Sequence, residues 1–326
     1  MSLSDDYRAI HEGAALGTIA ARGQIAVAGA DRAGYLQGLL TNDIAALTPG
    51  SGCYAAWLTP QGRMLTDMHV LESGDLILLD VPSDQLVPTI ERLDQFLFSE
   101  DVQLASLAAD LTSVWTHGPA AAAALQQVIR GAEGLGTWPV YGLAKATFAD
   151  APVVVARIDQ LGVPGFCTYV APASRASLEE ALEAHGACRV GSAALDAARI
   201  DAGYPVFGID MTTDTIPLEA GIDARAISLT KGCYVGQEVI IRVLHRGHGR
   251  VARRLVGLRA EGQVAARAKV MSGAREIGFI TSAGTSPVNG HVALGYVHRD
   301  FVEPGTQVTV AGDADGIHAT VGQKAR

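Results

Sequence analysis

The sequence contains few cysteines, and none of them is arranged to hold a metal or a disulfide framework. Only four occur in 326 residues, with no Cys-x-x-Cys pair and no Cys/His spacing typical of zinc. A disulfide scaffold and a built-in zinc or iron–sulfur site are therefore excluded, and no metal ligands are predicted. A cysteine with a function would act as a single thiol. The four are Cys53, Cys167, Cys188 and Cys233.

An excess of positive charge, long apolar runs and a leader segment are also lacking. Lys and Arg total 25 against 34 Asp and Glu, a formal charge of −9, which excludes a generally basic nucleic-acid binder. No uninterrupted apolar run approaches the roughly 20 residues that a bilayer span needs. The first residues, MSLSDDYRAIHEG, show neither a secretory signal nor an Arg-rich transit pattern. We expect a cytoplasmic protein with no membrane partner, and nucleic acid is not favoured as a partner.

The chain is long enough for two or three domains, and two stretches of it share one pattern. Each has two short strands, a proline, a serine that can cap a helix, and an amphipathic helix. The stretches are 53–97, with Ser83 as the cap, and 153–186, with Ser174 as the cap. A helix capped by Asp31 precedes the first of them. The order predicts an internal duplication of α+β units, although so common a pattern can also arise by chance.

The last part of the chain has a different character. From about residue 253 onward, short β-type runs alternate with Gly, Pro and Asn and show no helical period. This predicts a small all-β barrel domain. The predicted boundaries are 1–246 for the α+β region, with a split near 110–150, and 247–326 for the barrel, with the linker near 247–249.

The segment 229–247, LTKGCYVGQEVIIRVLHRG, is the most unusual local sequence. Its apolar spacing predicts a helix that begins around Val235 or Gly236, directly after Cys233. The positive end of that helix and the neighbouring Lys231 would favour thiolate over thiol. The alternative is that Cys233 is a small buried hydrophobe in a tight turn.

The segment upstream of it joins a short helix to an acidic loop. Ser192 is the expected cap of the helix, and Gly203 ends it. The loop that follows carries Asp210, Asp214 and Glu219, and long loops in compact domains are often functional. A solvated connection is the simpler interpretation, and the residues alone favour it.

The motif KGCYVGQE at 231–238 resembles the signature of the YgfZ/GcvT family, the folate-binding relatives of the glycine cleavage T-protein, and specifically its YgfZ branch. The surrounding sequence is consistent with this family. Similar segments run through most of the chain, namely LQGLLTNDI, LTPQGRMLTD, RIDAGYPVFGID, IPLEAGI and ALGYVHRDFVEPG. The resemblance implies an α+β, GcvT-like ring of three domains around a folate channel. Two ferredoxin-like α+β units and a C-terminal β-barrel would form the ring.

The resemblance also implies a function and a set of site residues. A YgfZ-type protein would bind tetrahydrofolate, or a one-carbon-substituted folate, and support assembly, maintenance or repair of iron–sulfur enzymes. Its partners would be folate and those enzymes or their assembly factors. The implied catalytic residues are Cys233, Lys231 and Asp67; the implied folate-binding residues are Arg199, Asp201, Tyr204, Gly232, Tyr234, Gln237, Glu238 and Arg242.

Two alternatives stay open, an aminomethyltransferase like the T-protein itself and a module that only binds folate. Asp67 would be the acid/base group of the transferase. The sequence departs from T-proteins at Asp201, where they have Glu, and at Thr66, where they have a second Asp. T-proteins also lack the KGCYxGQE motif, which favours the YgfZ branch.

Two further groups of residues have alternative interpretations. The basic run 242–254 could face the glutamate tail of a folate or an acidic partner, or it could be a solvated helix end. RNA binding is less favoured there because aromatic residues for stacking are missing from the run. Trp57, Trp115 and Trp138 lie in apolar contexts, which predicts core packing for all three.

Overall fold

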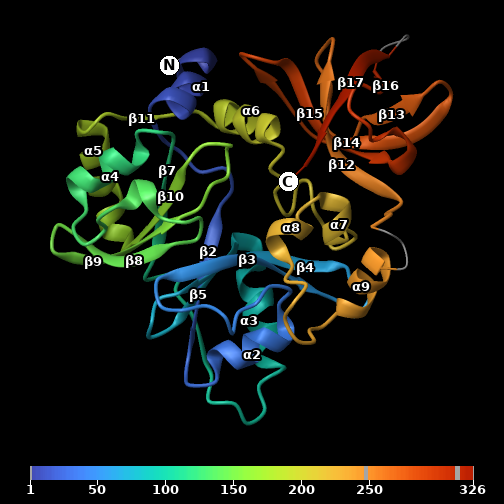
Figure 1. The fold of residues 1–326 in the computed structure, drawn as a ribbon. Helices are drawn as coiled ribbons and strands as arrows, with labels where there is room; N and C mark the ends of the chain where they lie inside the picture. Colours follow the sequence, from blue (N-terminus) through green and yellow to red (C-terminus); the bar gives the residue numbers. More distant parts are fainter. Residues whose placement is uncertain (1, 246–248, 313–315, 326) are drawn as a thin grey trace.

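The computed structural model describes residues 2–245, 249–312 and 316–325. Figure 1 shows two α+β units and a β-barrel arranged around a central segment of short helices. The predicted α+β fold with a C-terminal barrel is confirmed. No helix in the described ranges is long and apolar enough to cross a membrane.

The first unit is a five-stranded antiparallel sheet in the order β3-β4-β5-β2-β6, with helices α2 and α3 packed on one face. The apolar side chains of Tyr35, Leu36 and Leu39 of α2 and of the following Leu40 all lie in this core. The elements are β2 (Arg22–Ala28), α2 (Arg32–Leu39), β3 (Ser51–Leu58), β4 (Met64–Glu72), β5 (Ile77–Pro82), η1 (Ser83–Gln85), α3 (Leu86–Asp94) and β6 (Gln103–Ser106).

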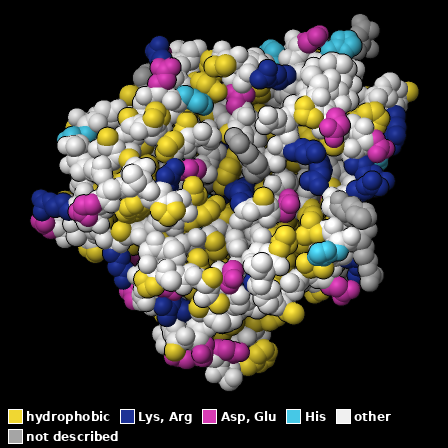
Figure 2. All heavy atoms as spheres, in the orientation of Figure 1, with side chains coloured by type: hydrophobic (Ala, Val, Ile, Leu, Met, Phe, Trp, Pro, Cys, Tyr) yellow, Lys and Arg dark blue, Asp and Glu magenta, His cyan; other side chains and the backbone are white. Residues whose placement is uncertain are grey.

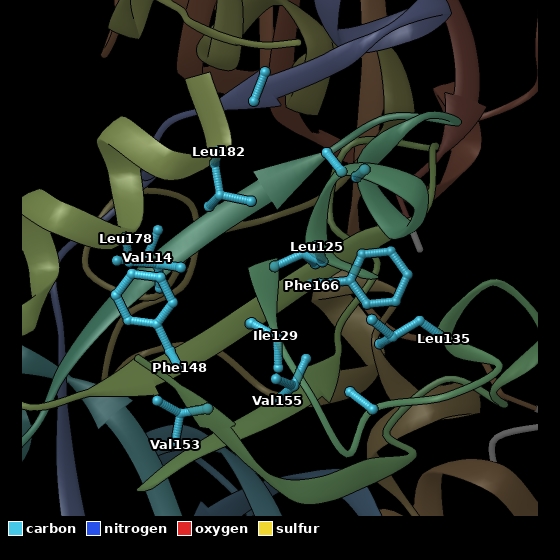
Figure 3. Packing of buried hydrophobic residues seen from close by; sticks show 14 of the residues in the cluster. Val114, Leu125, Ile129, Leu135, Phe148, Val153, Val155, Phe166, Leu178 and Leu182 are labelled. Carbon is cyan, nitrogen blue, oxygen red and sulfur yellow. The ribbon is translucent and has the colours of Figure 1, made fainter. Parts of the chain in front are cut away.

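The second unit is a six-stranded sheet in the order β11-β1-β7-β10-β9-β8, in which only the β1–β11 pair is parallel among the described strands. Figure 3 shows Leu178 of α5 beside Val114 and Phe148 of the sheet, and Leu125 of α4 beside Phe166, all within one buried cluster. The elements are α1 (Leu3–Glu12), β1 (Ala14–Leu16), β7 (Thr112–His117), α4 (Ala121–Val128), η2 (Leu135–Thr137), β8 (Leu143–Phe148), β9 (Ala151–Arg157), β10 (Gly165–Val170), η3 (Pro172–Ser174), α5 (Arg175–Ala184) and β11 (Ala187–Arg189).

The predicted repeat is present in both units. In each, a strand hairpin is followed by a short 3₁₀ turn and an α-helix: β4-β5-η1-α3 in the first and β9-β10-η3-α5 in the second. The units are also interleaved, because the N-terminal strand β1 pairs with strands of the second sheet and not with β2. The first sheet ends with β6 and the second resumes at β7.

The predicted helix caps are wrong in detail. Ser83 starts the turn η1, and Ser174 makes no cap hydrogen bond because its backbone is helical (φ −91°, ψ −8°) and not extended. Asp31 precedes α2, but its carboxylate accepts a hydrogen bond from the backbone of Asp101 instead. The residue before α6 is Gly191, so the expected cap Ser192 lies inside the helix.

The central segment connects the two units to the barrel. It contains α6 (Ser192–Ala202), α7 (Pro217–Ala220), α8 (Asp223–Ala226) and α9 (Gln237–His245), and α6 ends at Gly203 in the left-handed conformation (φ 70°), as predicted. Much of the acidic loop after α6 is structural, because Asp210 is buried.

The barrel is closed, with strand order β12-β15-β14-β13-β16-β17. Of the predicted linker near 247–249, only Gly249 lies within the described residues. The elements are β12 (Arg253–Ala260), β13 (Lys269–Ser272), β14 (Arg275–Ser286), β15 (Gly290–His298), η4 (Arg299–Phe301), β16 (Gln307–Val310) and β17 (Ile317–Lys324).

Candidate functional site

A cavity of about 520 Å³ lies where the second unit meets the central segment. Tyr204, directly after α6, and Arg225, on α8, form one side of it. The β9–β10 loop and the residues before β8 form the other side, with Gln160 and Tyr141 as polar members. In Figure 2, hydrophobic side chains gather near the middle of the face, where the lobes of Figure 1 meet.

Arg225 is the cation of this cavity. Its guanidinium lies between two aromatic rings, 4.2 Å from the centroid of Tyr54 and 4.3 Å from that of Tyr204. Its three nitrogens are buried and make no ion pair with any carboxylate in the described part of the chain. A buried cation without a carboxylate partner is costly; Tyr54, Tyr141 and Tyr204 offset part of this cost, and an anionic ligand would offset more.

Asp67 on β4 lies beside a second, much smaller cavity. Its carboxylate accepts a hydrogen bond from the Tyr54 hydroxyl at 2.7 Å and faces the Arg22 guanidinium at 3.4 Å. The space next to it is about 20 Å³, enough for roughly one water molecule. Gln160 and Tyr204 line both cavities, so they form the wall between Asp67 and the large cavity.

A buried polar network between the two sheets fixes this carboxylate. Arg22 also pairs with Asp80 at 2.9 Å, and Asp80 accepts a hydrogen bond from Tyr169 of the other sheet at 2.7 Å. Burial would raise the pKa of Asp80, but Arg22 and the nearby His69 hold it below its ordinary value. Asp67 is therefore held in one position by the packing of both units.

Four of these residues were missed by sequence reasoning: Arg22, Asp80, Gln160 and Arg225. Asp80 gave a usable signal, because a carboxylate inside the apolar run LILLDVP is buried only with a partner. Arg225 gave a weaker one, lying close to Ile222, Ala226 and Ile227, all of which are buried. Gln160 lies in a loop with no periodic pattern, so nothing local distinguished it.

Lys231 of the motif has a structural position. Its ammonium donates to the backbone oxygens of Gln37, Leu40 and Asn42 at 2.6, 2.7 and 2.8 Å, around the C-terminal end of α2. Cations are favourable there because the last carbonyls of a helix lack partners. Burial lowers the pKa of Lys231 to about 8. The residue anchors the motif loop to the first unit.

Cys233 is exposed on the loop between α8 and α9, so the alternative of a buried cysteine is wrong. The helix after it begins at Gln237, one or two residues later than expected. Gly236 has φ 85°, and a Cβ there would come 2.5 Å from the carbonyl oxygen of Thr59. The loop therefore packs so closely against the β3–β4 turn that only glycine fits at position 236. Cys233 does not line either of the two cavities.

The other predicted motif residues also lie outside the cavities. Glu238 and Arg242 form an exposed ion pair on α9 at 2.9 Å, and Gly232 is exposed. Gln237 is partly buried, and Tyr234 is buried with its hydroxyl lacking a hydrogen-bond partner in the described chain. Their assignment to folate stays a prediction without support from the lining of the cavities.

Arg199 and Asp201 lie at the junction with the barrel. Arg199 is buried and pairs with Asp210 at 2.9 Å and with the Ser282 hydroxyl at 2.8 Å. Asp201 accepts hydrogen bonds from Tyr7 at 2.8 Å and Asn289 at 2.9 Å. Their polar groups are thus occupied by protein partners, and the cavity that Tyr204 and Arg225 line is formed without them.

Some arginines of the basic run 242–254 bind other parts of the protein, and the three tryptophans are buried or partly buried. Arg253 pairs with Glu219 at 3.2 Å, and Arg254 donates to two backbone carbonyls, while Arg246 and His248 lie outside the described residues. Figure 2 shows several Lys and Arg side chains together over the barrel side of this face. Trp57 and Trp115 are buried as predicted, and Trp138 is partly buried and packs against the second core.

These features define a class: an α+β protein with two interleaved units and a terminal barrel, enclosing an anion-compatible cavity near a fixed carboxylate. The GCVT N-terminal domain model matches residues 1–231, and the glycine cleavage T-protein C-terminal barrel domain model matches residues 253–325. The chain therefore belongs to the glycine cleavage T-protein (GcvT) family.

Several known proteins align with most of this chain. An aminomethyltransferase of Synechocystis is 28% identical, covering 97% of this chain and 86% of that protein. A putative chloroplast transferase of Arabidopsis thaliana is 29% identical, covering 93% and 70%. The crystal structure of the glycine cleavage system aminomethyltransferase T of Bartonella henselae superposes with a TM-score of 0.86 at 24% identity, covering 99% of this chain and 88% of that one. The last likeness establishes the fold.

Proposed function

We propose that the protein binds a reduced folate in the 520 Å³ cavity and uses it in one-carbon transfer. The observation that carries the proposal is Arg225, a buried guanidinium at the cavity wall with no carboxylate partner in the described chain. A folate brings glutamate carboxylates, which pair well with a guanidinium. The volume lies within the roughly 300–1,000 Å³ typical of ligand pockets. The aminomethyltransferase names of similar proteins support the same activity.

Each cavity residue has a distinct task in this proposal. Arg225 would bind a ligand carboxylate, and the ring of Tyr204 would provide a stacking face while walling off Asp67. Reduced folates supply one-carbon units carried on a nitrogen of the ring or on the neighbouring bridging nitrogen. Asp67, held by Tyr54 and Arg22, would hold or accept a proton at those nitrogens once Tyr204 and Gln160 allow contact.

Binding of tetrahydrofolate by wild type, Arg225→Leu and Arg225→Lys tests the first part of the proposal. Loss of a buried ion pair to a ligand predicts at least a 30-fold weaker Kd for Arg225→Leu, with partial recovery in Arg225→Lys. Arg130→Leu is the matched control, because the Arg130 side chain is 87% exposed and lies 3.9 Å from Asp150, away from both cavities. Equal affinity in wild type and Arg225→Leu would contradict the proposal.

A ligand-side comparison avoids any folding defect of the variants. p-Aminobenzoylglutamate keeps the two carboxylates of the tail, and p-aminobenzamide lacks them. The proposal expects wild type to bind the first and not the second.

Turnover is tested separately. Asp67→Asn should abolish folate-dependent transfer from an amine donor, and it should leave tetrahydrofolate binding within about threefold, because Asp67 lies behind the wall of the large cavity. Unchanged turnover in Asp67→Asn would exclude it as the acid/base group.

A second candidate function is support of iron–sulfur enzymes through Cys233. The supporting observation is the exposed thiol, which lies on an anchored loop away from both cavities and near the exposed Leu229. One thiol cannot hold a cluster alone, so the remaining ligands would come from a partner. Cells lacking the protein should regain iron–sulfur enzyme activity with wild type and with Cys188→Ala, but not with Cys233→Ala. Full rescue by Cys233→Ala would exclude this role.

A further inference from the structure

A third cavity, of about 510 Å³, lies at one end of the barrel. It is lined by the linker between α9 and β12, by the start of β12, and by η4 with the residue that follows it. These segments are held together, because the first residues of β12 pair with the last of β15, and the Arg299 amide donates to the Ala252 carbonyl at 3.1 Å. The cavity shares no lining residue with either cavity described above, so it is a separate place on the protein.

Three arginines line this cavity, and none of them makes a short ion pair with a carboxylate that the structure describes. Arg254 is partly buried and donates to two backbone oxygens, at 2.9 and 3.3 Å. The Arg250 side chain is exposed and has no ion pair within the described ranges. Arg299 lies 3.8 Å from Asp300, which is too far for a hydrogen bond. Because a guanidinium has five N–H donors, all three arginines keep donors for a ligand.

The charges around the cavity match those of a phosphate group. Three positive side chains and one negative one leave a net charge of +2 in the lining, although the whole protein has a formal charge of −9. A phosphate monoester carries about −1.5 to −2 at pH 7, and its oxygens pair well with guanidinium groups.

The rest of the lining argues against a nucleotide or another aromatic ligand. Among the described lining residues only Val251 and Val302 are apolar, and none is aromatic, so a nucleobase would find no ring to stack on. We propose that Arg250, Arg254 and Arg299 bind a phosphate group in this cavity, either free or carried by a small polar molecule. This site is independent of the proposed folate cavity.

Isothermal titration calorimetry at fixed ionic strength tests the proposal with three ligands. Glycerol 3-phosphate is a small polar phosphate monoester, inorganic phosphate is the free anion, and glutarate is a dianion without phosphate. Arg250→Leu and Arg299→Leu each remove one positive charge from an exposed side chain, and Asp300→Asn removes the carboxylate of the lining. Arg130→Leu is the matched control, because it removes the same charge from a side chain that is 87% exposed and lies outside this cavity.

We expect wild type to bind glycerol 3-phosphate with a Kd below about 1 mM, and each of the two arginine variants to bind it about 3- to 10-fold more weakly. Asp300→Asn should bind it about two- to fivefold more tightly, because a repelling charge is lost. Damage to the fold would not produce this gain, so Asp300→Asn keeps the test decisive if an arginine variant fails to fold. Arg130→Leu should match wild type.

The two phosphate ligands identify the source of the group. Equal affinity for inorganic phosphate and glycerol 3-phosphate supports the site with the free anion as its ligand, and weaker binding of inorganic phosphate supports it with an ester as its ligand. Glutarate that binds wild type as tightly as glycerol 3-phosphate would overturn the assignment to phosphate. No binding of either phosphate ligand up to about 10 mM, or unchanged affinity in both arginine variants, would overturn the site itself.

Discussion

Removal of Arg22 should destabilise the protein strongly, and more at neutral than at acidic pH. The Arg22 side chain is 10% exposed and lies between two carboxylates, at 2.9 Å from Asp80 and 3.4 Å from Asp67. Arg22→Met has a similar length but leaves both anions without their cation. Breaking a buried pair in this way costs about 3–5 kcal/mol. For a chain of this size that corresponds to a decrease in Tm of about 4–7 °C at pH 8.

The pH dependence follows from the pKa of Asp80. Burial raises this pKa, but Arg22, His69 and Tyr169 together outweigh burial and hold it below its ordinary value in the folded wild type. A lowered folded-state pKa stabilises above the unfolded value of about 4, and this stability is lost as pH falls through the folded value. In Arg22→Met, only His69 and Tyr169 still oppose the effect of burial, so the pKa of Asp80 should be higher than in wild type, and protonation of Asp80 on acidification relieves the unpaired charge. The Tm difference from wild type should therefore shrink between pH 8 and pH 5.

Differential scanning fluorimetry of wild type, Arg22→Met and Arg175→Met at both pH values measures this effect. Arg175 is half-exposed and pairs with Glu179 on one helix, so its replacement should shift Tm by less than about 2 °C. A Tm of Arg22→Met within 2 °C of wild type at pH 8, or a difference that grows on acidification, would refute the reasoning.

Three further predictions concern His117, Lys231 and Gly236. Burial lowers the pKa of His117 to about 4, so stability should fall by up to about 3 kcal/mol as pH drops from 6.5 to 4, and urea unfolding of His117→Gln should show a shallower decline. Lys231→Met should lose about 2–3 kcal/mol in urea unfolding, because three carbonyls lose their donor, whereas Cys233→Ala beside it should match wild type. Gly236→Ala should make the motif loop more sensitive to limited proteolysis, because its Cβ would collide with Thr59, and resistance equal to wild type would contradict the close contact.

The repeat of the two units was readable because it depends on local patterns. The hairpins β4-β5 and β9-β10 were predicted from the turn residues between their strands. Burial does not alternate along β4, β5 and β10, which are almost wholly buried. The helix caps were predicted less well, because a side chain can cap a helix only when the backbone of the residue before the helix is extended. A 3₁₀ turn before α3 and α5 changed that geometry in both units.

The sequence did not show which residues of the motif 231–238 are buried and which are exposed. Lys231 and Cys233 are two residues apart, yet the first is buried against α2 and the second faces solvent. Adjacent residues in an irregular loop can point to opposite sides, and no periodicity tells which. For the same reason the sequence did not show that Arg199 contacts Ser282 of the barrel and that Asp201 accepts a hydrogen bond from Tyr7 of α1.

The sequence by itself determined the α+β units, the barrel, the family and the presence of one singular cysteine. Only the tertiary structure decided that Asp67 and Cys233 belong to different places, and that Arg225 and Gln160 join Tyr204 at one cavity. The physical reason is that the cavity walls come from the β9–β10 loop, α8 and the end of α6, which meet only when the two sheets and the central segment pack together. Local patterns encode which residues are buried; they do not encode which distant residues share a cavity.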